Sequence, residues 1–399
     1  MLKKNVPVVA LLFMLALTGC KSSGAANGAA DVSATPQPTV QATETPAATQ
    51  SPQASPAGTP VAGTSDKPTK VAMTGVTAVR LADAKSGWIG GKGWIAHTTD
   101  SGKQWQIQYE GNGEIKQLFA LNGQEAWASV GQDGKLLSTK DGGQHWASAG
   151  KVPNTAFFHF ISKSEAFSGN AHTVDGGANW STMPVPEGIA GDAYFHDAKN
   201  GWAVKPGKDT VEVLRTQDGG KTWNSVMSRK TAAGITGTVI RSAGANDAWV
   251  ELIGESGMTQ TSYSLFHTKD GGKIWQTVLA NSTAGGGPAP GFPAGDTSGP
   301  KNTGSKPGPL YVVSPDVAFM GGQCPACDKP NSVGWTKDGG KTWVNGQETF
   351  TGYGELLLAM ADANQGWMIT NDNEQPSVMY TTGNGGVNWT KAHTFDAPK

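Results

Sequence analysis

An eight-residue box recurs seven times along the chain and carries the residue types of several kinds of site. It reads Thr-x-Asp-x-Gly-x-x-Trp, as in TKDGGKTW from Thr336. A carboxylate beside glycines and a lysine is compatible with a calcium loop, a phosphate cradle, a catalytic acid or a turn. The acidic positions of the seven boxes are Asp100, Asp141, Asp175, Asp218, Asp270, Asp338 and, as a variant, Asn384.

The recurrence of the box favours a structural turn over a site. Successive boxes are 34 to 68 residues apart, which is the sequence signature of a repeat protein. A calcium ion needs several oxygen ligands, whereas each box has one carboxylate. A phosphate loop needs a helix behind it, and none is predicted here. We therefore expect a turn in which the carboxylate accepts backbone N–H groups, and we expect neither a metal nor a cofactor.

A second motif precedes each box and shows which elements the turns connect. It is a short apolar stretch centred on an aromatic residue, with an alternating apolar run before it and another before the box. Such alternation predicts strands, so each repeat contains four of them, named a to d. The aromatic residues of strand b are Trp88, Trp127, Phe167, Trp202, Trp249, Phe319 and Trp367.

The paired motifs resemble the Asp-box (bacterial neuraminidase repeat) class, and most of all the photosystem II stability and assembly factor family. The resemblance covers about residues 71 to 395. It implies an all-β fold, a seven-bladed β-propeller of four-stranded antiparallel blades over residues 71–399. In this class the box is the turn between strands c and d.

The N-terminal region predicts an anchored protein. Residues 1–19 resemble a bacterial lipoprotein signal peptide that ends in a lipobox, LTGC, which implies a lipid on Cys20; an ordinary signal peptide is the alternative. From Lys21 to Lys70, 32 of 50 residues are Ala, Pro, Thr or Ser and none is aromatic, so residues 20–70 are predicted to be a disordered tether. We expect an extracytoplasmic, membrane-anchored lipoprotein.

The charge of the chain argues against nucleic acid as a partner. The formal net charge is −1, which provides no long-range field for a polyanion. We expect a monomer that binds no nucleic acid.

The innermost strand of each repeat supplies a candidate binding ring. Counting eight residues back from the aromatic of strand b reaches a position expected to line the central channel. Five of the seven positions carry residues that can bind a ligand, namely Arg80, His159, Tyr194, Arg241 and Tyr311. The other two are Phe119 and Ala359, and aromatic packing between blades is the favoured interpretation of the ring.

An enzyme is not expected. The resemblance to sialidases would require three convergent arginines, whereas the chain has four in all and only two of them on the ring. The arginine-isoleucine-proline signature of sialidases is also missing, because Leu81 follows Arg80. No Ser-His-Asp arrangement or metal-binding histidine spacing is recognisable.

The connections vary most in the later repeats. The distance from the strand-b aromatic to the box Trp is 13 to 19 residues in the first three repeats and 21 to 26 in the last four. A Gly/Pro-rich insertion, Thr283–Pro309, separates the fifth and sixth repeats. Cys324 and Cys327 lie in the b–c loop of the sixth repeat and are predicted to form a disulfide. The partner site is therefore expected on the b–c side of the last four repeats.

These observations predict a non-catalytic, surface-tethered propeller that binds a protein or an envelope polymer, with an assembly-factor-like or chaperone-like role. The alternative is a propeller that binds glycans or hydrolyses glycosides, in the manner of a sialidase. Both hypotheses place function in what differs between repeats, because the scaffold itself is shared by many activities.

Overall fold

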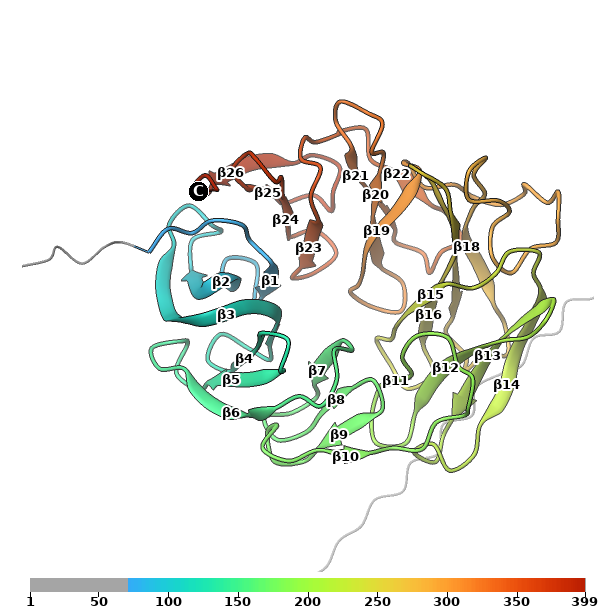
Figure 1. Ribbon diagram of the computed structural model, residues 1–399, viewed down its shortest axis with the longest axis horizontal. Helices are drawn as coiled ribbons and strands as arrows, with labels where there is room; N and C mark the ends of the chain where they lie inside the picture. Colours follow the sequence, from blue (N-terminus) through green and yellow to red (C-terminus); the bar gives the residue numbers. More distant parts are fainter. Residues whose placement is uncertain (1–70, 399) are drawn as a thin grey trace, which may run out of the picture. The chain divides into compact units, whose positions relative to one another are not determined.

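A computed structural model describes residues 71–398 of the chain. These residues form short strands that tight turns connect. The strands form antiparallel sheets arranged in a ring (Figure 1). Among these residues, no helix is long and apolar enough to cross a membrane. The predicted signal peptide, the lipidation site Cys20 and the tether lie outside the described residues.

The first sheet has six strands and the other sheets have four each. The first consists of β1 (Ala78–Leu81), β2 (Gly87–Thr98), β3 (Gln106–Ala120), β4 (Ala126–Val130), β5 (Lys135–Thr139) and β6 (Ala147–Lys151). The second and third consist of β7 (Phe158–Phe160), β8 (Ala166–Ser168), β9 (Ala171–Thr173) and β10 (Ser181–Thr182), and of β11 (Tyr194–Phe195), β12 (Gly201–Pro206), β13 (Thr210–Thr216) and β14 (Asn224–Lys230). The fourth consists of β15 (Gly237–Arg241), β16 (Ala248–Ser256), β17 (Thr261–Thr268) and β18 (Gln276–Asn281). The last two consist of β19 (Lys306–Val312), β20 (Ala318–Gln323), β21 (Asn331–Thr336) and β22 (Val344–Asn345), and of β23 (Leu356–Met360), β24 (Gly366–Thr370), β25 (Val378–Thr382) and β26 (Thr390–Thr394).

The prediction of seven separate four-stranded blades is wrong, because the described residues form six sheets. The all-β propeller is six-bladed when each hydrogen-bonded sheet is taken as one blade. The difference arises at β3, which pairs with β2 through Glu114 and with β4 from Ile115 onward. One continuous strand thus serves the first and the second sequence repeat, and seven repeats map onto six sheets.

Tight turns fix the register between the first two strands of a repeat. The Oδ1 atom of Asp83 accepts hydrogen bonds from the backbone N–H groups of Lys85 and Ser86, each at 2.8 Å. Asp197 and Asp362 cap the corresponding turns of the fourth and seventh repeats in the same way. An Asx turn of constant length leaves one register for the hairpin.

The aromatic residues of strand b form the core between sheets. All seven are at most 3% exposed, as in Trp88, Trp202 and Trp249 at 0%. The box tryptophans lie further out, and six of the seven are half-buried. The two tryptophan positions of a repeat therefore contribute unequally to the core.

The boxes are hydrogen-bonded turns. In the fourth repeat the Thr216 hydroxyl donates to Asp218 at 2.8 Å, and Asp218 accepts the backbone N–H of Thr222 at 2.9 Å. A hydrogen bond of 2.6 Å from the Thr222 hydroxyl, together with these two, lowers the pKa of Asp218 to about 2. Gly220 has φ +89°, and a Cβ there would lie 2.1 Å from the Pro184 carbonyl oxygen, which explains the glycine.

The N-terminal segment of the domain closes the ring. The Met73 backbone N–H donates to the Asp396 carboxylate at 2.8 Å, and Thr74 forms a parallel bridge with Asp396. Val76 and Phe395 are buried in a cluster that includes residues of the first and last sheets. The two ends of the domain are thus joined by backbone pairing and by shared core.

Candidate functional site

The inner strands place the predicted ring residues at equivalent positions. Each lies directly opposite the strand-b aromatic of its own repeat, as in Arg80 opposite Trp88 and Arg241 opposite Trp249. The same pairing joins His159 to Phe167. The structure places the remaining ring residues, Tyr194 and Tyr311, opposite Trp202 and Phe319.

The ring residues contact one another in pairs. The guanidinium of Arg80 lies 4.5 Å from the Phe119 ring centroid and 5.7 Å from that of Tyr311. His159 stacks on Tyr194 with centroids 4.9 Å apart. The structure therefore contains both an arginine at cation–π distance from two aromatic rings and an aromatic stack.

Burial keeps the aromatic members neutral. Burial first, and then neighbouring positive charge, lowers the pKa of His159 to about 3. Burial also raises the pKa of Tyr194 to about 12. Neither ring nitrogen of His159 has a hydrogen-bond partner within residues 71–398. These two side chains pack between sheets and carry no charge at neutral pH.

Neither of the two ring arginines has a carboxylate partner among residues 71–398. In the described part of the chain, no arginine lies within ion-pair distance of Asp or Glu. Arg241 lies 3.9 Å from the Phe157 centroid, and its Nη1 donates to the Ile240 carbonyl at 2.8 Å. Burial lowers the pKa of Arg241, and a guanidinium is a cation throughout the accessible pH range.

A hollow of about 280 Å³, here called the mouth, exposes both arginines. It is lined by the inner strands β1, β3, β15, β19 and β23 and by the connection at Phe157. Lys116 and Glu355 lie at its edge, and Lys116 is paired with Glu114 at 2.9 Å. The mouth therefore presents more unpaired positive than negative charge.

Two further hollows adjoin the mouth on the side of the earlier repeats. One, of about 400 Å³, shares Lys116 and Gln117 with the mouth and extends between the turn at Gly131 and the connection at Thr155. The other, of about 180 Å³, shares Phe157 and Arg241 with it. The recessed surface is thus continuous from the mouth toward the second, third and fourth repeats.

The Gly/Pro-rich insertion is packed against the propeller. Phe292 is 4% exposed, and its ring lies 4.8 Å from the Arg229 guanidinium, which also lies 4.9 Å from the Phe266 ring. Arg229 Nε donates to the Gly291 carbonyl at 2.9 Å. The insertion thereby covers parts of β14 and β17, and its last residues begin β19.

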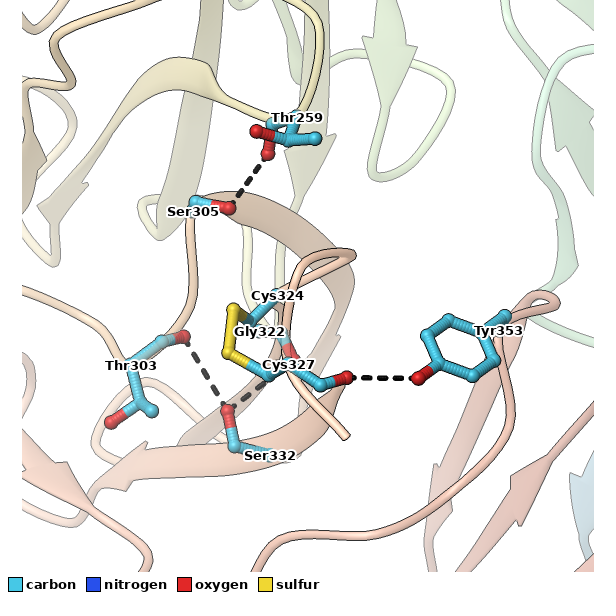
Figure 2. Close-up of a disulfide and its surroundings, with 8 residues drawn as sticks. All are labelled: Thr259, Thr303, Ser305, Gly322, Cys324, Cys327, Ser332 and Tyr353. Carbon is cyan, nitrogen blue, oxygen red and sulfur yellow. Dashed lines mark hydrogen bonds between the residues drawn. A yellow bond between two sulfur atoms is a disulfide. The ribbon is translucent and has the colours of Figure 1, made fainter. Parts of the chain in front are cut away.

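The structure has a disulfide between Cys324 and Cys327 in the b–c loop of the sixth repeat (Figure 2). The Cys327 carbonyl accepts a hydrogen bond from the Tyr353 hydroxyl at 3.1 Å. Nearby, the Ser305 hydroxyl donates to the Thr259 carbonyl at 2.7 Å. The loops of the fifth, sixth and seventh repeats are therefore tied to neighbouring connections.

Sequence reasoning missed the most unusual ionisable group near the mouth, which is Glu251. This residue of β16 is 2% exposed, and its Oε1 atom has no hydrogen-bond partner among residues 71–398. Burial raises the pKa of Glu251 to about 8, with Arg241 acting in the opposite direction. A comparison of the repeats could have found it, because the second residue after the strand-b aromatic is charged in this repeat alone.

Within residues 71–398, no three His, Cys, Asp or Glu side chains lie together in a way that could hold a metal ion. The box carboxylates are engaged in their own turns. The chemistry available at the mouth is therefore ionic and hydrogen-bonded recognition.

No family model matches the chain. The photosystem II assembly lipoprotein Ycf48 of Synechococcus sp. (strain CC9902) is 27% identical over 137 residues, which are 31% of this chain and 39% of that protein. The match thus spans well under half of the relative. It confirms the resemblance to photosystem II assembly factors for part of the chain.

Similar solved structures include YCF48 bound to D1 peptide, at 14% identity over 79% of this chain and 92% of the other, with a TM-score of 0.46. YCF48 from Cyanidioschyzon merolae gives 16% identity, coverages of 79% and 94%, and a TM-score of 0.46. A GH74 enzyme from Niastella koreensis gives 14% identity, coverages of 80% and 66%, and a TM-score of 0.37. These similarities are too distant to assign an activity.

Proposed function

We propose that this protein is a non-catalytic binding module whose mouth receives an anionic group on a segment of a partner protein. The observation that carries the proposal is the pair of arginines in the mouth, Arg80 and Arg241, neither of which has a carboxylate partner within residues 71–398. Arginine donates two parallel hydrogen bonds to a carboxylate, and a partly dry site strengthens such contacts.

The setting of the arginines favours an extended polypeptide over a sugar. Sugars bind on exposed aromatic faces, whereas the aromatic residues of the mouth are packed by neighbours, with Tyr311 half-buried beneath Arg80. The recessed surface that continues from the mouth past Gln117 and Thr155 has room for residues that flank the anionic group. The partial match to an assembly lipoprotein supports an assembly-factor-like role toward a membrane protein.

Tethering to the outer face of a membrane is also part of the proposal. The lipobox ending at Cys20 supports it, and the Pro/Thr/Ala-rich segment after it is long enough to hold the propeller away from the lipid. Metabolic labelling with palmitate checks the anchor. A Cys20→Ser variant that still incorporates label would reject Cys20 as the lipidated residue.

Binding to a peptide array with free and amidated C-termini tests the site. The double variant Arg80→Ala/Arg241→Ala should lose at least about tenfold in affinity for carboxylate-bearing peptides, since losing even one ion pair in a partly buried site costs at least about 1.4 kcal/mol. The matched control is Lys205→Ala, which removes an exposed cation from β12. Unchanged affinity of the double variant, or hydrolysis of model glycosides by the wild-type protein, would reject the proposal.

A further inference from the structure

Glu251 lies beside Arg241 in the sheet. Val239 of β15 is its direct partner on one side, and Leu265 of β17 is its partner on the other. Arg241 is two residues beyond Val239, so its side chain projects from the same face of the sheet and is the diagonal neighbour of Glu251. The carboxyl group is thus the acidic side chain that the strand register brings next to the mouth arginine.

The remaining surroundings of Glu251 are largely apolar. The face that carries Glu251 packs against Leu310, Ala318 and Met320 of the next sheet. Besides Arg241 on β15, the titratable group that faces it is Tyr263 on β17, whose hydroxyl also lacks a hydrogen-bond partner within the described part of the chain. The carboxyl is almost fully shielded from solvent, and its Oε1 atom receives no hydrogen bond from residues 71–398, so the protonated form is the stable one at neutral pH.

We propose that Glu251 is a positioning residue that controls whether Arg241 is free to bind an anionic group in the mouth. When Glu251 is protonated, Arg241 has no intramolecular counter-ion and its guanidinium is available to the ligand. When Glu251 is ionised, it attracts the guanidinium and competes with the ligand. The proton exchanges with solvent, and no covalent bond changes. The inference rests on the proposed function, because it requires an anionic ligand at the mouth.

The binding arm of the test uses the tightest carboxylate-bearing peptide from the array. Wild-type affinity should be constant from pH 6 to 7 and should fall severalfold once the pH passes about 8, the pKa of Glu251. Glu251→Gln cannot ionise and should keep its affinity above pH 8. Glu255→Gln is the matched control, since it changes an exposed glutamate on the same strand and should follow the wild type.

The stability arm needs no ligand. The pKa of Glu251 rises from 4.5 to about 8 on folding, so the folded state holds a proton that the unfolded state loses between these values. Wild-type stability should therefore fall, relative to Glu251→Gln, as pH rises from 4.5 to 8, and the difference should then stay constant. Denaturant unfolding at several pH values measures it.

The two arms separate the possible failures. Parallel stability curves for wild type and Glu251→Gln would show that Glu251 is not held protonated and would overturn the inference. If the wild type and Glu251→Gln differ in stability as expected but bind the peptide with the same pH dependence, Glu251 does not control Arg241. The proposed binding function would then remain intact. If no peptide binds at any pH, the proposed function fails, and the inference fails with it.

Discussion

The two sides of the propeller rim are built differently. In the second and third repeats the b–c turns are short, and the recessed surface extends from the mouth between Gly131 and Thr155. In the fifth and sixth repeats the connections are long, but the insertion covers β14 and β17, and the disulfide loop is bonded to Tyr353. The longer loops are occupied by contacts with their neighbours. The longer loops are thus less available to a partner than their length suggests.

The shortest inner strands lie next to the recess. β7 has three residues and β11 has two, whereas β15 has five and β19 has seven. The hollow beside β11 is lined by Phe157 and by Arg241 of β15, which a ligand in it can contact. We therefore expect different consequences for substitutions near the recess and for substitutions in the long connections of the fifth and sixth repeats.

The largest effect on stability is expected from a substitution in the Gly/Pro-rich insertion, which packs against the propeller. Phe292→Ala should lower the free energy of unfolding by about 3 to 5 kcal/mol, because it removes a buried ring that contacts Phe266 and Arg229. Urea denaturation measures the change. Met258→Ala is the control, since that side chain is 97% exposed and should have no measurable effect. Equal stabilities of the Phe292→Ala variant and the wild type would mean that the insertion is not part of the folded rim.

A smaller effect is expected from the disulfide. Replacing Cys324 and Cys327 by Ser should cost at most about 2 kcal/mol, because the bond closes a ring of only a few residues. Peptide affinity at the mouth should not change, since the mouth lining contains neither cysteine. A loss of affinity in the double serine variant would place the partner site on the later repeats and would break the comparison.

The smallest effect on stability is expected from substitutions in the boxes. It should be the same for boxes near the recess and for boxes near the long connections. The pKa values of Asp141 and Asp218 are about 2, lowered from 3.8 by hydrogen bonds within their turns. A lowered pKa stabilises the fold above pH 3.8, and this contribution is lost as the pH falls through the folded-state pKa of about 2. Asp141→Asn and Asp218→Asn should therefore lower the melting temperature slightly at pH 7 and by clearly less at pH 2. Differences as large at pH 2 as at pH 7 would show a role other than the ionised turn.

The sequence by itself determined the repeat and its strands. Box and aromatic positions predicted four strands per repeat, which the structure shows in the last five repeats, and counting eight residues back from Trp88 and Trp249 reaches Arg80 of β1 and Arg241 of β15. Both regularities have the same cause. Hydrogen bonds within a few residues, such as those of the Asp83 turn, fix the hairpin register without help from the rest of the fold.

Only the tertiary structure decided how many sheets form, how the ring closes and what lies beside the mouth. The shared strand β3 depends on the pairing of Glu114 and Ile115 with two different partners, and ring closure depends on Met73 meeting Asp396, 323 residues away. Glu251 acquires its unusual pKa because another sheet excludes water from it. These features arise from contacts between residues far apart in the chain, and local sequence patterns carry no record of which distant surfaces will meet.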